Sequence, residues 1–377
     1  MRQPDARSST VLDSGLSKTP TATIAPTRSG AIEKSRQKVL ITTPLEPEQV
    51  ESLRLRHPDF EIVYPEELLA IPRYAGHHVA APTDSPERLL AWRELLAGTD
   101  ILFDFGPSAL HAELTGLPRL KWIQATSSGV GQFARRVGLT ERSDLIVTTA
   151  SGVHGAALAE FVVMSMIYFN RGFGGVIRDQ RAHHWQRGAG RLIAGQTVGI
   201  VGLGSVGGAT ARYVCALGAR VIGVVRSLAG RTAADCGVAR LVAQQDLDHV
   251  LPELDVLVLA VPHTAETEGL LSARRIGLLA PTCLFVNIAR GSVVDEPALV
   301  AALQAGRIKG AALDVFAEEP LPPTSPLWDL PNVLVSPHSA STVEGENEKI
   351  VDLFSANLLR YRAGEPLLNV LNSELLY

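Results

Sequence analysis

The chain has 377 residues, a formal net charge of −4, and 46% hydrophobic and 20% charged residues, which is typical of a soluble globular protein. This length favours two domains over one compact core. The small negative charge provides no basic surface for nucleic acid or an anionic membrane, and no apolar run is long enough to cross a bilayer. The three cysteines lack CxxC spacing, which predicts a reducing, cytoplasmic location without disulfides or a metal site.

Residues 1–37 are rich in Ser, Thr, Pro and Arg and show no apolar periodicity, so we predict a disordered tail. A transit peptide is the weaker alternative, because Asp5, Asp13 and Glu33 interrupt a composition that should be poor in acids.

The next stretch alternates short β-branched runs with amphipathic segments. Strands are predicted within residues 38–45, 59–65, 99–105 and 120–126. One helix is predicted within residues 48–56, and another between Ser85, its N-cap, and Gly98, with Pro86 at the first helical position. Strands that alternate with helices predict an α/β domain with a parallel sheet.

Residues 154–173 form the longest apolar helical stretch of the chain. A helix that is apolar on most sides is buried, so we expect it between domains or subunits. Met164, Met166 and Phe169 are interpreted as packing residues rather than as part of a cofactor site.

A second alternating series follows. Its strands are predicted within residues 197–204, 220–225, 239–243, 255–261, 283–289, 310–316 and 332–338. Helices are predicted within residues 205–218 and 296–306, and a long helix within residues 342–364 with Ser341 or Thr342 as its cap. Such a series predicts a doubly wound parallel sheet covered by helices on both faces.

Gly202, Gly204 and Gly207 form a G-x-G-x-x-G motif between an apolar strand and a helix. In that context the first glycine permits a tight turn, the second lets a pyrophosphate approach the backbone, and the third lets the helix pack on the strand. The helix N-terminus then offers free N–H groups to the phosphates. The motif predicts dinucleotide binding and does not by itself separate NAD from FAD.

The strand after this motif ends at Val225, where an NAD-specific protein would carry an Asp or Glu for the adenosine ribose. Arg226 and Ser227 follow, and both can donate hydrogen bonds to a 2′-phosphate. We therefore predict a preference for NADP, with NAD possible. The alternative is that Arg226 is a solvated loop residue.

Three later segments carry ionisable residues at or just beyond the ends of predicted strands. They are Arg290, Asp314 with Glu318 and Glu319 in the turn that follows, and His338. Strand C-termini of an open α/β sheet face the ligand crevice, so these side chains can converge there. Each residue alone has an ordinary structural explanation, but their common position favours a catalytic site.

At this point the sequence resembles the D-isomer-specific 2-hydroxyacid dehydrogenases. The matching segments, in the family's order, are SSGV, GVHGAALAEFVV, GLGSVG, VPHTAETEGLL, VNIARGSVVDE, ALDVFAEEPLP and VSPHSA. The resemblance extends from about residue 38 to the C-terminus. It implies two Rossmann-like domains, with a dinucleotide-binding domain (151–339) inserted into a discontinuous substrate domain (38–150 and 340–377).

The resemblance also implies the roles of the catalytic groups. His338 would be the general acid/base, and Glu319 would be its partner, because a carboxylate beside an imidazole favours the protonated ring. Arg290 would bind the carboxylate and carbonyl of the substrate. Asp314 would hold the nicotinamide carboxamide, and the backbone at Ser128 and Gly129 would cradle the substrate carboxylate.

Further positions that the resemblance assigns to the cofactor accompany the three glycines. They are Ser205, Val206, Pro262 and Ile288. The family is commonly homodimeric, so a homodimer is expected, with the helix near Phe161 at the subunit or domain junction.

The implied activity is the interconversion of a small 2-keto acid and its D-2-hydroxy acid, most simply as an NADPH-preferring glyoxylate/hydroxypyruvate reductase. Phosphoglycerate is disfavoured as a substrate, because residues 101–109 contain no basic residue for its phosphate and no appended regulatory domain is expected. A phosphite dehydrogenase and a dinucleotide-sensing corepressor-like scaffold stay as alternatives. Gly131 departs from the family, which often has an acid at that position.

Overall fold

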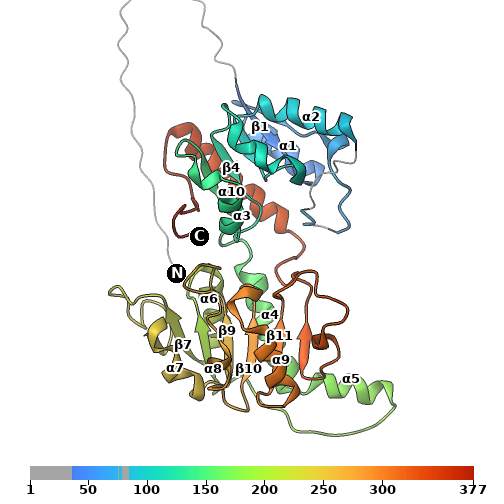
Figure 1. The fold of residues 1–377 in the computed structure, drawn as a ribbon, viewed down its shortest axis with the longest axis vertical. Helices are drawn as coiled ribbons and strands as arrows, with labels where there is room; N and C mark the ends of the chain where they lie inside the picture. Colours follow the sequence, from blue (N-terminus) through green and yellow to red (C-terminus); the bar gives the residue numbers. More distant parts are fainter. Residues whose placement is uncertain (1–35, 75, 79–84) are drawn as a thin grey trace, which may run out of the picture. The chain divides into compact units, whose positions relative to one another are not determined.

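The computed structural model describes residues 36–74, 76–78 and 85–377. Nearly all of the tail predicted at residues 1–37 therefore lies outside the described residues. The described residues form two parallel sheets with helices (Figure 1), which confirms the predicted fold class.

The first sheet has the strand order β2-β1-β3-β4-β5, and each neighbouring pair is parallel. Its strands are β1 (Gln37–Ile41), β2 (Phe60–Val63), β3 (Ile101–Phe103), β4 (Trp122–Gln124) and β5 (Ile146–Thr148). The sequence analysis missed β5, whose three residues are too few to show a clear alternation.

Four α-helices accompany this sheet: α1 (Pro47–Arg56), α2 (Pro86–Ala97), α3 (Gly131–Arg136) and α10 (Glu346–Ala363). The predicted ends of α2 are confirmed, since the Ser85 hydroxyl accepts a hydrogen bond from the Arg88 N–H at 3.2 Å and Gly98 follows the last turn. A 3₁₀ helix, Ser108–Gly116, lies between β3 and β4.

The helix α10 brings the end of the chain back to the first sheet. Phe354 is fully buried, and its ring lies 4.9 Å from that of Phe103 and 5.1 Å from that of Trp122, centroid to centroid. The predicted cap of this helix was wrong: Gly345, with φ +77°, precedes the first helical residue. A left-handed residue at that position stops the helix from extending back to Ser341 or Thr342.

The second sheet has the order β12-β11-β10-β9-β6-β7-β8, again with every neighbouring pair parallel. Its strands are β6 (Thr197–Val201), β7 (Arg220–Val225), β8 (Arg240–Ala243), β9 (Val256–Leu259), β10 (Leu284–Asn287), β11 (Gly310–Leu313) and β12 (Val333–Val335). The order reverses between β6 and β9, and a doubly wound sheet binds its ligand at such a reversal.

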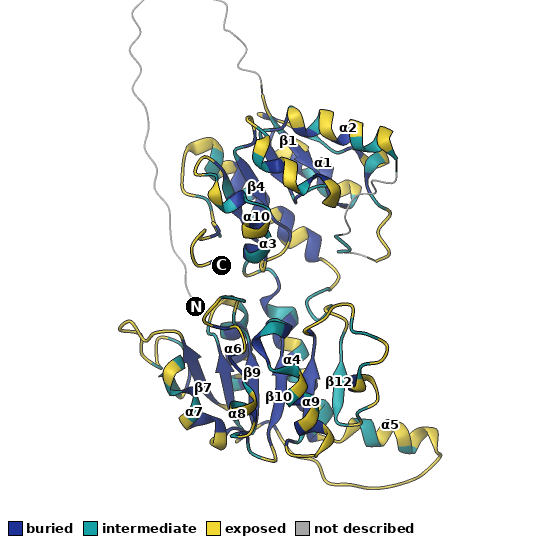
Figure 2. Ribbon diagram, in the orientation of Figure 1, coloured by how far each residue is buried: buried dark blue, intermediate teal, exposed yellow. Residues whose placement is uncertain are grey.

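The remaining α-helices of the described residues come between β5 and β12 in the chain. They are α4 (Gly155–Asn170), α5 (Phe173–Arg181), α6 (Ser205–Ala216), α7 (Leu247–Val250), α8 (Ala273–Ile276) and α9 (Glu296–Gln304). Figure 2 shows that β7, β9 and β10 are buried, as expected for inner strands with helices on both faces.

The helix α4 is buried on one face only. Leu158, Val162 and Met166 belong to the core under the second sheet. Met164 and Ile167, on the other face, are 44% and 43% exposed, so within the chain itself Met166 packs in the core and Met164 does not.

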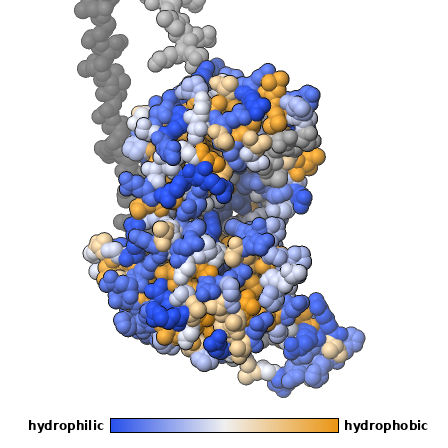
Figure 3. Space-filling model, in the orientation of Figure 1, coloured by the Kyte–Doolittle hydropathy of each residue, from blue (hydrophilic) through white to orange (hydrophobic). Residues whose placement is uncertain are grey.

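The surface of the described residues is mixed. Figure 3 shows hydrophilic side chains interspersed with small hydrophobic groups on the face in view. Within residues 36–74, 76–78 and 85–377, the structure contains no helix with the length and apolarity that a membrane span needs.

Candidate active site

The glycine motif forms a tight turn between β6 and α6. A Cβ atom at position 202 would lie 2.5 Å from the Ala260 carbonyl oxygen, and the residue has φ +93°, so glycine is required there. A Cβ atom at position 207 would lie 1.8 Å from the Gly202 carbonyl oxygen. Gly204 has open space at its Cβ position and precedes the twelve-residue helix α6. The turn therefore leaves room for a pyrophosphate at a helix N-terminus.

A cleft of about 240 Å³ lies beside this turn at the end of β7. Gly202, Gly204, Arg226 and Pro262 are among its lining residues, whereas Ser227 is exposed and lies outside it. Glu266 also lines this cleft. The sequence analysis missed this acid, because it comes from the loop after β9 and not from the end of β7.

His338 and Glu319 form a close pair. The His338 Nδ1–H donates to Glu319 Oε2 at 2.7 Å, and Glu319 Oε1 accepts from the Phe316 N–H at 3.0 Å. This arrangement leaves Nε2 of the imidazole for a substrate. The imidazole is 44% exposed, so a small molecule can reach it.

Asp314 holds the turn that carries His338. Its Oδ1 accepts hydrogen bonds from the Ser336 hydroxyl at 2.6 Å and from the Ser339 and Ala340 N–H groups, both at 2.9 Å. The Asp314 carbonyl accepts from the His338 N–H at 2.9 Å. These bonds stabilise His338 at φ +51°, a left-handed conformation that costs about 1–3 kcal/mol in a non-glycine residue.

Arg290 lies against the loop predicted to bind the substrate. Its Nη1 donates to the Ala289 carbonyl at 2.7 Å and its Nη2 to the Gly129 carbonyl at 3.3 Å. A Cβ atom at position 129 would lie 1.5 Å from Arg290 Nη2, so the glycine makes room for the guanidinium. Burial lowers the pKa of Arg290, and the charges of Glu319 and Asp314 oppose that shift.

Two further clefts bring most of the predicted site residues together. A cleft of about 290 Å³ is lined by Ser128, Gly129, Gly204, Ser205, Val206, Pro262, Ile288 and Arg290. A cleft of about 470 Å³ is lined by Ser128, Ile288, Arg290, Asp314 and His338. Because Ser128, Ile288 and Arg290 line both, the glycine turn and the His338 side chain open onto one continuous site.

Several polar residues of the larger cleft were missed by the sequence analysis. His154 and Glu346 are buried, with His154 Nε2 3.0 Å from Glu346 Oε1, and His78 lies in contact with Thr43 at 3.1 Å. These residues belong to no sequence motif, since they come from loops and helix ends far apart in the sequence. Among the described residues, no cluster of three or more His, Cys, Asp or Glu side chains has a metal-binding arrangement.

Asp104 is a further cleft residue with an unusual environment. Burial raises the pKa of its carboxyl from 3.8 to about 6, against the hydrogen bonds from Phe105 and Thr126. The folded state therefore binds this proton more tightly than the unfolded chain does. The resulting stability penalty is absent well below the unfolded pKa of 3.8, grows as the pH rises from there to about 6, and is constant at higher pH.

We expect Asp104→Asn to increase the free energy of unfolding at pH 7.5 by about 1–2 kcal/mol, and the gain to vanish below about pH 3. Asparagine also tolerates the left-handed backbone of this residue, φ +68°. Urea denaturation across this pH range tests the expectation, with the exposed Asp329→Asn as a matched control. A difference that does not change with pH would contradict it.

A doubly wound domain with a glycine turn at its strand reversal, opening onto a His–Glu pair and a half-buried arginine, defines the class of dinucleotide-dependent oxidoreductases. Residues 163–340 match the model of the D-isomer specific 2-hydroxyacid dehydrogenase, NAD binding domain. Over 265 residues the chain is 32% identical to glyoxylate reductase of Thermofilum pendens, covering 69% of this chain and 77% of that protein. The chain belongs to the D-isomer specific 2-hydroxyacid dehydrogenase family and is an NAD(P)-dependent 2-hydroxyacid dehydrogenase.

Two other similar proteins differ in their named activity. D-3-phosphoglycerate dehydrogenase of Mycobacterium leprae is 34% identical over 279 residues, which cover 72% of this chain and 50% of that protein. The structure of the NADPH-dependent glyoxylate/hydroxypyruvate reductase of Sinorhizobium meliloti, in complex with NADP and sulfate, superposes with a TM-score of 0.70. It is 25% identical and covers 90% of this chain and 100% of that chain.

Proposed function

We propose that the protein reduces small 2-keto acids to D-2-hydroxy acids, with glyoxylate and hydroxypyruvate as preferred substrates and NADPH as preferred cofactor. The observation that carries the proposal is the convergence of Arg290 and His338 on one cleft that continues to the glycine turn. The similarity to glyoxylate reductases supports the substrate class.

In the proposed reaction, the bound dinucleotide supplies the hydride. Arg290 and the backbone N–H groups at Ser128 and Gly129 bind the substrate carboxylate, and the planar guanidinium also reaches the carbonyl oxygen. His338 donates the proton of Nε2 to that oxygen as negative charge develops on it. Glu319 stabilises the protonated imidazole and fixes its orientation through the 2.7 Å contact with Nδ1.

The cofactor would lie along the two smaller clefts. Gly202, Gly204, Ser205, Val206 and Gly207 would hold the pyrophosphate. Pro262 and Ile288 would line the nicotinamide half of the site, and Asp314 would hold the carboxamide. All described hydrogen bonds of the Asp314 carboxylate go to Oδ1, so the other carboxylate oxygen is left for the carboxamide. Through the hydrogen bonds to Oδ1, Asp314 would also position His338.

For the cofactor preference, we expect Arg226→Ala to weaken NADPH binding about tenfold or more while changing NADH binding less than threefold, because the lost hydrogen bonds to a 2′-phosphate are charge-assisted. Fluorescence titration with both cofactors measures this. The exposed Arg307→Ala is the matched control. An equal loss for both cofactors would support the alternative that Arg226, like Ser227, is a solvated loop residue.

We also propose domain boundaries at residues 38–150 with 340–377 for the substrate domain and 151–339 for the dinucleotide domain. The packing of α10 on the first sheet supports the discontinuous substrate domain.

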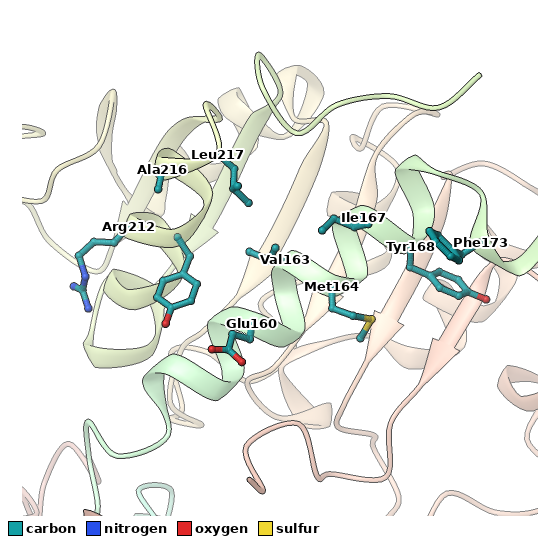
Figure 4. A pocket seen from close by; sticks show the side chains of 10 residues that line it. Glu160, Val163, Met164, Ile167, Tyr168, Phe173, Arg212, Ala216 and Leu217 are labelled. Atoms are coloured by element: carbon teal, nitrogen blue, oxygen red, sulfur yellow. The ribbon is translucent and has the colours of Figure 1, made fainter. Parts of the chain in front are cut away.

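The exposed face of α4 supports the proposal of a homodimer. An apolar groove of about 820 Å³ lies between α4 and α6. Figure 4 shows Val163, Met164, Ile167 and Tyr168, which line it from α4. Leu217 and Tyr213 of α6 line the groove as well. A groove of this size and apolarity on a soluble protein is typical of a subunit interface. A second copy of this chain is the occupant that the family resemblance implies.

Replacement of Met164 by Glu should convert the dimer to a monomer, because a charge would be buried at the centre of the interface. Sedimentation velocity measures the change, and Leu55→Glu, at a residue of α1 that is 73% exposed, is the matched control. A wild-type protein that sediments as a monomer would contradict the proposal.

A further inference from the structure

The last six residues of the chain form a closed turn, here called the C-terminal hook (residues 372–377). The Asn372 side-chain oxygen accepts hydrogen bonds from the Glu374 and Leu375 N–H groups at 2.9 and 2.7 Å. The Leu376 N–H donates to the Asn372 carbonyl at 2.8 Å, and Asn372 N–H donates to the Tyr377 carbonyl at 3.2 Å. These contacts give the hook a defined conformation.

The hook is seated on the start of α3. The Leu376 side chain is 5% exposed, and Arg135 of α3 donates to the Glu374 carbonyl at 3.2 Å. A Cβ atom at position 131 would lie 2.0 Å from the Leu376 carbonyl oxygen. The resemblance to the family implies that an acid often stands at this position, and here any side chain would displace the hook.

Seated in this way, the hook brings Tyr377 to the dinucleotide site. Tyr377 lines the cleft that contains Gly204 and Arg290, and also the cleft that contains Gly202 and Arg226. The Arg226 guanidinium carbon lies 5.8 Å from the centroid of the Tyr377 ring, within the range of a cation–π contact. Among the described residues, the Arg226 guanidinium makes no hydrogen bond or ion pair, and the Tyr377 ring is the one aromatic group that it faces.

We propose that Tyr377 is a positioning residue for Arg226, and so a determinant of the preference for a 2′-phosphorylated cofactor. The inference rests on the NADPH preference proposed above. Arg226 is exposed at the end of β7, and a long side chain loses rotamer freedom when it binds a phosphate. A ring that already restricts the guanidinium lowers this cost, because pre-organisation strengthens binding without adding a contact to the ligand.

The test is fluorescence titration of the full chain with NADPH and with NADH, without any keto acid. We expect Tyr377→Ala to weaken NADPH about fivefold more than NADH, a factor equivalent to about 1 kcal/mol. Tyr377→Phe retains the ring and should restore the preference. Leu375→Ala, at a residue of the hook that is 38% exposed, is the matched control. Gly131→Asp should reproduce the loss by displacing the hook, with thermal melting as the check on folding.

A double-mutant cycle separates positioning from direct binding. In the Arg226→Ala background, Tyr377→Ala should cause no further loss that is specific to NADPH. Equal losses for both cofactors, additive effects in the cycle, or tighter NADPH binding by Tyr377→Ala would each overturn the inference. Because the titration needs no turnover, a failure of the keto-acid activity would leave this result interpretable.

Discussion

We expect His338→Asn to lower kcat for every 2-keto acid by about 10³-fold and to leave the affinity for the dinucleotide nearly unchanged. This is the expected result, because general acid catalysis contributes roughly 10²–10⁴-fold and asparagine has no proton to donate at neutral pH. The imidazole borders the larger cleft, whereas the glycine turn lies along the two smaller ones. The proton donor can therefore be replaced without a change in the cofactor-binding turn.

Steady-state kinetics and cofactor titration on the same preparation measure the two effects. His184→Asn is a matched control, since that imidazole is 60% exposed and lies outside the three clefts. A parallel loss of turnover and cofactor affinity would indicate that His338 is structural. His338 has a left-handed backbone and a hydrogen bond to Asp314, so its replacement could also destabilise the fold. A melting curve of the variant tests for that loss.

Arg290→Lys is expected to lower kcat/KM about 10²–10³-fold, a loss of about 3–4 kcal/mol of transition-state stabilisation. Lysine keeps the positive charge but not the planar pair of donors that fits a carboxylate and an adjacent carbonyl. It also loses the contacts that orient Arg290, to the carbonyls of Ala289 and Gly129.

A comparison of glyoxylate with its methyl ester tests whether Arg290 binds the substrate carboxylate. The ester has the reacting carbonyl but no carboxylate, so the wild type should favour the acid strongly and the Arg290→Lys variant should favour it much less. Arg307→Lys is the matched control. If the variant retains the wild-type preference for the acid, Arg290 does not bind the carboxylate.

The sequence predicted the second sheet more completely than the first. Its inner strands are continuous apolar runs. Its glycine motif also predicts the turn between β6 and α6, where Gly202 and Gly207 are both needed for close approach of the backbone. In the first sheet β5 is too short for periodicity to detect, and the start of α10 depends on the left-handed Gly345 rather than on a capping side chain.

For the candidate site, the sequence indicated the residues at strand ends but not those that converge from loops. Arg290, His338 and Glu319 follow strands, and parallel strands end at one edge of a sheet. Glu266, Asp104 and Tyr377 reach the clefts through tertiary packing that no local pattern encodes. The need for a glycine at position 131 follows from the position of Leu376, which no local pattern of the sequence encodes.

The central claim is the reduction of small 2-keto acids, and a substrate panel tests it most directly. kcat/KM is measured for glyoxylate, hydroxypyruvate, pyruvate and 3-phosphohydroxypyruvate, each with NADPH and NADH, and for phosphite with NADP and NAD. We expect glyoxylate or hydroxypyruvate with NADPH to give the highest value, at least tenfold above the same acid with NADH. Highest activity on the phosphorylated acid or on phosphite, or tight cofactor binding without turnover of any compound, would contradict the account. The last outcome would instead favour a dinucleotide-sensing protein.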